Sequence, residues 1–121
     1  SPDCIDAAVK PLIDDSSIMM STLIRKCTDK EDLENNNIVK VVADKDDFAM
    51  YFSRSCIPFE RSKGLMDHYL HIGLYVYRRE TLIELSKMNP VPVELTESLE
   101  QLRALYHGIK IKTWRTWEVS L

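Results

Sequence analysis

Residues 97–103 have the sequence Glu-Ser-Leu-Glu-Gln-Leu-Arg, which predicts the first turns of a helix. Thr96 is a suitable N-cap before this stretch, and Gly108 supplies a stop at its C-terminal end. At about 100° per residue the helix has an apolar face and a polar face, so its apolar side must pack against the rest of the fold. The apolar face carries Leu99, Leu102, Leu105 and Tyr106, and the other carries Glu97, Glu100, Gln101 and Ala104.

The polar face of this helix has two interpretations. It can simply be solvated, as charged helix faces usually are. Alternatively, its carboxylates and its amide suit a polyhydroxylated ligand, because sugar hydroxyls need both acceptors and donors at fixed positions. The spacing is compatible with both interpretations.

The segments on either side of this helix alternate between strand and helix patterns. Residues 109–114 alternate in the manner of a strand, and residues 79–88 have helical spacing. The sequence Asn-Pro-Val-Pro at residues 89–92 ends that second helix, because proline cannot continue it.

Residues 69–77, Tyr-Leu-His-Ile-Gly-Leu-Tyr-Val-Tyr, predict the most regular strand of the chain. Alternation places His71 and Tyr75 on one face, about 13 Å apart at roughly 3.3 Å per residue, with Gly73 between them. This gap could hold a ligand. Equally, Gly73 could mark a bulge, with the rings packed under a helix. His68 and His71 fall on opposite faces of a strand, so we expect no metal pair there.

The N-terminal half has the pattern of a helix followed by strands. Ser1 and Pro2 predict a helix start, residues 18–24 a buried strand, and residues 28–34 a short helix. Residues 38–43 and 48–52 predict an antiparallel hairpin around the turn at 44–47. The irregular connection at 53–63 carries Arg54 and Arg61, which are either ligand contacts or solvated side chains.

Composition limits the functional classes. The chain has 121 residues, enough for one domain, and its net charge of -3 gives no electrostatic case for nucleic acid or for an acidic membrane surface. No apolar stretch is long enough to span a bilayer, and no secretory signal is present. Three widely spaced cysteines argue against a disulfide framework and favour a reducing cytoplasm. No glycine-rich loop is available to hold phosphates.

Four motifs occur together in a characteristic order. They are Tyr-Phe-Ser-Arg at 51–54, Ile-Pro-Phe-Glu-Arg at 57–61, His-Ile-Gly-Leu-Tyr-Val-Tyr-Arg at 71–78, and Glu-Ser-Leu-Glu-Gln-Leu-Arg at 97–103. Residues 37–42 also fit. In these motifs the chain resembles the 3-deoxy-manno-octulosonate cytidylyltransferase family, also called CMP-Kdo synthetases. The resemblance extends over most of the chain from residue 37 onward.

The resemblance implies an α/β fold, part of a Rossmann-like nucleotidyltransferase domain with a mixed sheet and an antiparallel hairpin region. It implies a cytoplasmic, homodimeric enzyme of lipopolysaccharide biosynthesis in a Gram-negative bacterium. Such an enzyme uses CTP and Mg²⁺ to convert the eight-carbon sugar acid Kdo into CMP-Kdo and pyrophosphate. The anomeric hydroxyl attacks the α-phosphorus of CTP while metal neutralises phosphate charge.

The resemblance also implies roles for individual side chains. His71 and Tyr75 would line the sugar pocket, and Glu100 and Gln101 would hydrogen-bond hydroxyl and carboxylate groups. Arg54 is a candidate partner for the sugar carboxylate, because a guanidinium fork matches it. Glu97 is a further candidate substrate-binding residue.

Members of the family are about twice as long as this chain, and their metal carboxylates and CTP loop lie outside the part that it matches. We therefore expect residues 1–121 to be one sugar-binding and dimer-forming half, with no catalytic residue and no metal ligand of its own. The alternatives are a cytidylyltransferase for an amino-substituted Kdo or a sialic acid, a non-catalytic binding or interaction module, and a piece cut from a longer protein without a role of its own.

Overall fold

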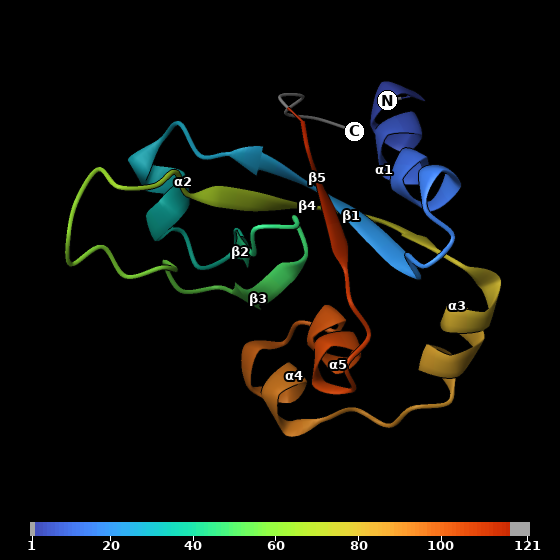
Figure 1. The fold of residues 1–121 in the computed structure, drawn as a ribbon. Helices are drawn as coiled ribbons and strands as arrows, with labels where there is room; N and C mark the ends of the chain where they lie inside the picture. Colours follow the sequence, from blue (N-terminus) through green and yellow to red (C-terminus); the bar gives the residue numbers. More distant parts are fainter. Residues whose placement is uncertain (1, 117–121) are drawn as a thin grey trace.

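The structure is a computed structural model that describes residues 2–116 (Figure 1). The predicted cap Ser1 and the last five residues lie outside the described part. The elements in chain order are α1 (Pro2–Asp14), β1 (Met20–Lys26), α2 (Lys30–Glu34), β2 (Lys40–Ala43), β3 (Ala49–Ser53), β4 (Tyr69–Tyr77), α3 (Arg79–Ser86), α4 (Pro92–Glu97), α5 (Gln101–Tyr106) and β5 (Lys112–Arg115).

The strands form one mixed sheet in the order β3-β2-β4-β1-β5. β1 runs parallel to β5, with Ser21 opposite Lys112, whereas the other neighbouring pairs are antiparallel. The predicted hairpin is confirmed as β2 and β3, joined by the turn at residues 44–47. The predicted α/β class and mixed sheet are therefore both confirmed.

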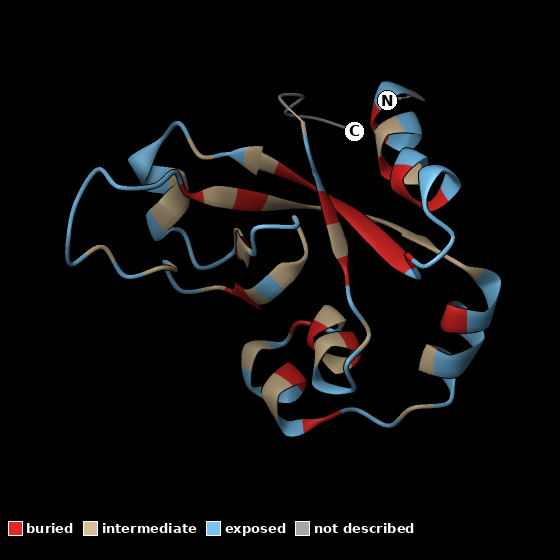
Figure 2. Ribbon diagram, in the orientation of Figure 1, coloured by how far each residue is buried: buried red, intermediate tan, exposed pale blue. Residues whose placement is uncertain are grey.

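Helices cover the two faces of this sheet. On one face α1 packs through Cys4 and Ala8 against Leu23 of β1 and against Ile72, Leu74 and Val76 of β4. On the other face α5 and the turn before it close a larger core (Figures 1 and 2). This second core consists of Met20, Ile24, Val41, Phe52, Leu99, Leu102, Ala104 and Ile111.

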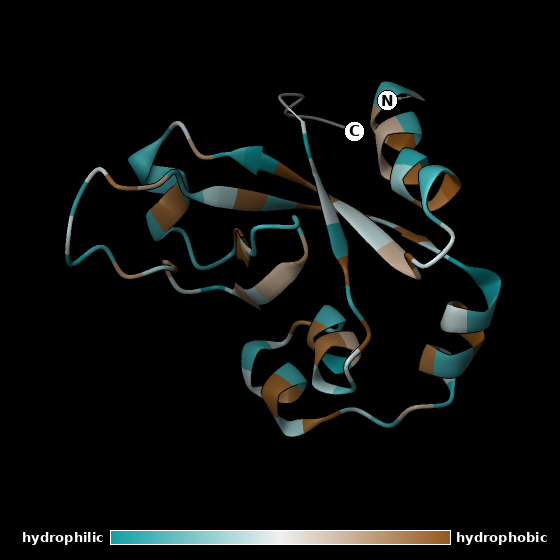
Figure 3. Ribbon diagram, in the orientation of Figure 1, coloured by the Kyte–Doolittle hydropathy of each residue, from teal (hydrophilic) through white to brown (hydrophobic). Residues whose placement is uncertain are grey.

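β1 is buried from Met20 to Ile24 because both of its faces are covered. The covering helices alternate hydrophilic and hydrophobic residues (Figure 3), as expected for helices with one face on a core. Among the described residues, no helix is both long enough and apolar enough to cross a membrane.

The single helix predicted from residue 97 is wrong, because the structure divides this region into α4 and α5. α4 begins at Pro92, and Thr96 lies inside it with its hydroxyl donating to the Pro92 carbonyl rather than capping a new helix. α4 ends at Glu97 because Ser98 adopts the left-handed conformation, with φ 56°. The predicted faces are therefore wrong for two residues. Ala104, predicted on the polar face, is buried, and Tyr106, predicted on the apolar face, is 61% exposed.

The strand predicted at residues 69–77 is confirmed as β4, but its pairing with β1 is irregular. Thr22 faces Tyr75 and Leu23 faces Ile72, so Gly73 and Leu74 have no partners across the pair. The Thr22 hydroxyl lies inside this bulge and donates to the Leu74 carbonyl at 2.7 Å. The bulge interpretation of Gly73 is therefore confirmed.

Candidate functional site

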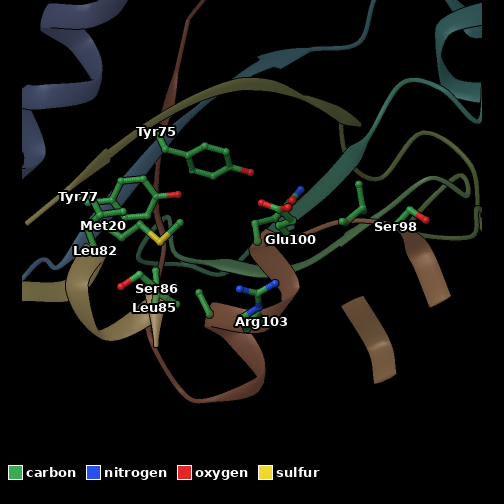
Figure 4. A pocket seen from close by; sticks show the side chains of 12 residues that line it. Met20, Tyr75, Tyr77, Leu82, Leu85, Ser86, Ser98, Glu100 and Arg103 are labelled. Atoms are coloured by element: carbon green, nitrogen blue, oxygen red, sulfur yellow. The ribbon is translucent and has the colours of Figure 1, made fainter. Parts of the chain in front are cut away.

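A pocket of about 470 Å³ lies between the end of β4, α3 and the turn that joins α4 to α5 (Figure 4). Met20, Leu82 and Leu85 give it an apolar wall. The polar groups are two tyrosines of β4 on one side and side chains of the α4–α5 region on the other. They are Tyr75, Tyr77, Ser98, Glu100, Gln101 and Arg103, together with Ser86 of α3.

Tyr75 contributes the most unusual polar atom of this pocket. Its hydroxyl is buried and has no hydrogen-bond partner among the described residues. In Figure 4 the hydroxyl points across the pocket toward the side that carries Glu100. Burial raises the pKa of Tyr75, and Tyr77 and Glu100 raise it further, so the hydroxyl stays protonated. A buried hydroxyl without a partner costs about 1–3 kcal/mol, which a ligand could recover.

His71 lies behind Tyr75 rather than on the pocket surface. Its ring centroid is 5.2 Å from that of Tyr75 and 4.9 Å from that of Phe52. The predicted open gap between His71 and Tyr75 is therefore wrong, because the bulge at Gly73 and Leu74 brings the two rings into contact.

The hydrogen bonds of His71 fix its tautomer. Its Nε2 lies 2.8 Å from the Thr22 hydroxyl, which already donates its single hydrogen to the Leu74 carbonyl. Nε2 must therefore carry a hydrogen and donate, leaving Nδ1 as an acceptor. Burial lowers the pKa of His71 to about 4, so the ring is neutral at pH 7.

Glu100 and Gln101 lie at the start of α5 and line the opposite side of the pocket. Glu100 provides a carboxylate acceptor, and Gln101 provides an amide that both donates and accepts. Together with the Tyr75 hydroxyl they surround one space with mixed hydrogen-bonding groups, the combination that a polyol needs.

Arg103 is the cationic side chain among the described residues that line the pocket. It forms a bidentate pair with Glu94 of α4, with Nε 2.8 Å from Oε1. Glu94 is buried, and its Oε1 also accepts from the Val91 N–H at the start of α4. Hydrogen bonding from Arg103 lowers the pKa of Glu94, and the same pairing raises the pKa of Arg103. The pair ties α4 to α5 below the pocket.

Glu97 and Arg54 lie outside the pocket lining. The Glu97 carboxylate accepts from the Ser53 hydroxyl at 2.6 Å, the Arg54 N–H at 3.0 Å and the Tyr51 hydroxyl at 3.2 Å. Burial alone would raise the pKa of Glu97, but the hydrogen bonds from Ser53 and Arg54 lower it overall. The Arg54 guanidinium donates to the carbonyls of Glu97, Ser98 and Asn36.

The structure thus sorts the predicted site residues into three positions. Tyr75, Glu100 and Gln101 surround one pocket, His71 supports the Tyr75 ring, and Arg54 and Glu97 contact each other beneath the α4–α5 turn.

Tyr77 and Arg103 were not among the predicted site residues, although both line the pocket. Tyr77 shares a strand face with Tyr75 and stacks on it, with centroids 5.9 Å apart. Arg103 follows Glu100 by three residues on one helix face. Both spacings were available in the sequence as signals.

The described residues contain no group of three or more His, Cys, Asp and Glu side chains that could hold a metal ion. His68 and His71 have separate partners, since Nε2 of His68 lies 3.1 Å from the Pro58 carbonyl. Within residues 2–116, the site is therefore made of hydroxyl, amide, carboxylate and guanidinium groups beside an apolar wall.

Comparison with known proteins gives consistent matches. The sequence model of a family described as cytidylyltransferase matches residues 1–111. The chain is 46% identical over 114 residues to a 3-deoxy-manno-octulosonate cytidylyltransferase of Fusobacterium nucleatum, covering 94% of this chain and 46% of that protein. It is 42% identical over 131 residues to the protein of that name from Geobacter sulfurreducens, covering 99% and 52%.

A solved structure also resembles the chain. It is CMP:2-keto-3-deoxy-manno-octonic acid synthetase complexed with CTP, with a TM-score of 0.91 and 32% identity over 97% of this chain and 48% of that one. The chain spans about half the length of the curated relatives that it matches. Because the family match covers nearly all of the sequence and agrees with the fold, this chain belongs to the cytidylyltransferase family.

Proposed function

We propose that this chain is the sugar-binding part of a 3-deoxy-manno-octulosonate cytidylyltransferase, and that its pocket binds the eight-carbon sugar acid Kdo. The whole enzyme transfers CMP from CTP to this acid and releases pyrophosphate. The observation that carries the proposal is the buried Tyr75 hydroxyl, which lacks a partner and faces a pocket lined by Glu100 and Gln101. The names of the similar proteins support the identity of the sugar acid.

The pocket would hold the sugar by its hydroxyl groups. Tyr75 and Gln101 each donate and accept, and Glu100 accepts, so neighbouring hydroxyls can be recognised from two sides. The ring of Tyr77 and the side chains of Leu82 and Leu85 would contact the C–H groups of the sugar. In this proposal the described residues bind and orient the acceptor, and the reacting phosphate is held elsewhere in the enzyme.

The proposal includes Mg²⁺ and CTP as parts of the whole enzyme. The residues that the structure describes do not provide a metal-binding cluster, so we assign them no step that involves the metal. We also propose that the enzyme is a cytoplasmic homodimer. The apolar side chains of Phe59 and Leu65, which are 86% and 81% exposed in the segment between β3 and β4, are consistent with such an assembly.

Isothermal titration calorimetry tests the proposal. We expect this chain to bind Kdo, and the paired substitutions Tyr75→Phe and Gln101→Ala to weaken binding by at least tenfold. Tyr106→Phe is a matched control, because Tyr106 is 61% exposed and does not line the pocket. A titration with CTP and Mg²⁺ then shows whether nucleotide binding needs the rest of the enzyme, as we propose.

Two results would contradict the proposed function. If a folded chain does not bind Kdo, the pocket is not a sugar site by itself, and a role as an interaction module becomes the better explanation. If an amino-substituted Kdo or a sialic acid displaces Kdo with higher affinity, the substrate is a different sugar acid. Circular dichroism of each variant establishes that the chain is folded before titration.

A further inference from the structure

We propose that Arg54 is a positioning residue of the sugar site, which holds the α4–α5 turn in the conformation that presents Glu100 and Gln101 to the pocket. In this proposal, which rests on the proposed function, Arg54 acts through the backbone of the turn rather than as the partner of the sugar carboxylate.

The turn needs such support because it interrupts a helix. α4 ends at Glu97, and Ser98 has φ 56° and ψ 48°, a left-handed conformation that non-glycine residues adopt at a cost. The carbonyls at the end of a helix lose their usual intrahelical donors. Among the described residues, Arg54 donates the hydrogen bonds that the carbonyls of Glu97 and Ser98 accept.

Arg54 meets this need with its planar fork. Its Nε donates to the Glu97 carbonyl at 2.7 Å, Nη2 to the Ser98 carbonyl at 3.1 Å, and Nη1 to the Asn36 carbonyl at 3.3 Å. A guanidinium presents these donors in fixed directions, whereas a lysine ammonium is a compact charge on a flexible stem. Arginine can therefore fix two successive carbonyls of the turn together.

Arg54 is itself held in place from two directions. Its N–H donates to the Glu97 carboxylate at 3.0 Å, and its carbonyl accepts from Nζ of Lys40 at 2.7 Å. Lys40 is fully buried, and its Nζ also donates to the Asn35 carbonyl at 2.6 Å. The end of β3, the loop at residues 35–36 and the turn after α4 are thus joined into one hydrogen-bonded unit.

The same geometry argues against a direct contact between Arg54 and the acid. Three of the five N–H groups of its guanidinium already have backbone acceptors, and Arg54 is absent from the pocket lining. The pocket itself carries the Glu100 carboxylate, while the Arg103 guanidinium is paired with Glu94. The pocket that this chain forms is therefore suited to the hydroxyl groups of the sugar.

Titration of Arg54→Lys with two ligands separates the two roles. The ligands are Kdo and its uncharged methyl ester. A positioning role predicts that Arg54→Lys loses about tenfold in affinity for both, because the loss comes from displaced Glu100 and Gln101. If Arg54 contacts the carboxylate directly, the Arg54→Lys variant should lose affinity for the acid alone, and it should lose only part of that affinity because lysine keeps the positive charge. That pattern overturns the proposal. Arg79→Lys, at an exposed position on α3, is the matched control.

A second variant and a second readout keep the test independent of folding and of the proposed function. Ser53→Ala removes the 2.6 Å hydrogen bond to Glu97 and the 3.1 Å hydrogen bond that the Ser53 hydroxyl accepts from the Ser55 N–H, but leaves the Arg54 guanidinium in place. It should cause a smaller loss that is again equal for both ligands. Without any ligand, hydrogen exchange of the Leu99 and Leu102 amides should accelerate at least tenfold in Arg54→Lys, while β4 amides stay unchanged. Unchanged exchange at the turn in Arg54→Lys would overturn the proposal, whether or not the wild-type protein binds sugar. Failure of the wild-type protein to bind sugar would count against the proposed function alone.

Discussion

Replacing Tyr75 with phenylalanine should have opposite effects on stability and on ligand binding. The substitution removes one hydroxyl, which is buried without a partner among the described residues, and leaves the ring contacts with His71 and Tyr77 in place. A buried polar group without a partner costs about 1–3 kcal/mol, because the unfolded chain hydrates that group fully. The free protein should therefore become more stable.

The expected gain is about 1 kcal/mol, at the low end of this range, because the hydroxyl borders a pocket rather than a closed core. For a chain of this size, a gain of about 1 kcal/mol corresponds to a rise in melting temperature of about 3–6 °C. Binding of Kdo should weaken, since a neutral hydrogen bond contributes about 0.5–1.5 kcal/mol, or roughly 2- to 13-fold in affinity.

Urea denaturation and calorimetric titration measure these two effects on the same preparations. Tyr106→Phe should change the free energy of unfolding by less than about 0.5 kcal/mol, because its side chain is exposed. A loss of stability in Tyr75→Phe would refute the reasoning, since it would mean that the hydroxyl has a partner in the free protein. A gain in stability with unchanged Kdo affinity would refute the part of the argument that concerns the ligand.

Three further perturbations test other parts of the structure. The pKa of His71 is about 4 in the folded chain against 6.5 ordinarily, so as the pH falls the unfolded chain takes up this proton before the folded chain does. Stability should therefore fall by about 2 kcal/mol between pH 7 and pH 5, and urea titrations of His71→Gln should lack this component. Leu102→Ala should cost about 2–5 kcal/mol in urea denaturation, because Leu102 is 1% exposed in the larger core; a cost below about 1 kcal/mol would show that the core refills the cavity. Ser98→Gly should raise the melting temperature through a gain of about 1 kcal/mol, because glycine adopts the left-handed conformation without strain; a decrease would show that the Ser98 side chain stabilises the turn.

The strands of this chain were predictable because their information is local. β4 alternates with period two over its whole length, and the hairpin of β2 and β3 has turn residues between two strands of high β-propensity. The division between α4 and α5 was not predictable in the same way. Leu99, Leu102 and Leu105 keep helical spacing after the break, and serine at position 98 gives no signal for a left-handed conformation.

The candidate site was predictable where a side chain itself faces the pocket. Tyr75, Glu100 and Gln101 lie around it as their strand and helix faces suggested, although their binding of a sugar stays a prediction. The position of Arg54 was not predictable from spacing, because its acceptors are backbone carbonyls, two of them more than 40 residues away in sequence. A carbonyl acceptor leaves no trace in the sequence, since every residue type has one.

Two irregularities, the bulge that Gly73 suggested and the helix break at Ser98 that periodicity missed, are also the features that form the pocket. In a regular β4, His71 and Tyr75 would stand about 13 Å apart, and no imidazole would support the Tyr75 ring. In a continuous helix, Glu97 would share a face with Glu100 and Gln101, whereas the break at Ser98 directs Glu97 to Ser53 and leaves the other two at the pocket. Regular elements satisfy their own backbone groups and present side chains at fixed intervals. Interrupting one strand and one helix is what brings the Tyr75 hydroxyl opposite the Glu100 and Gln101 side chains.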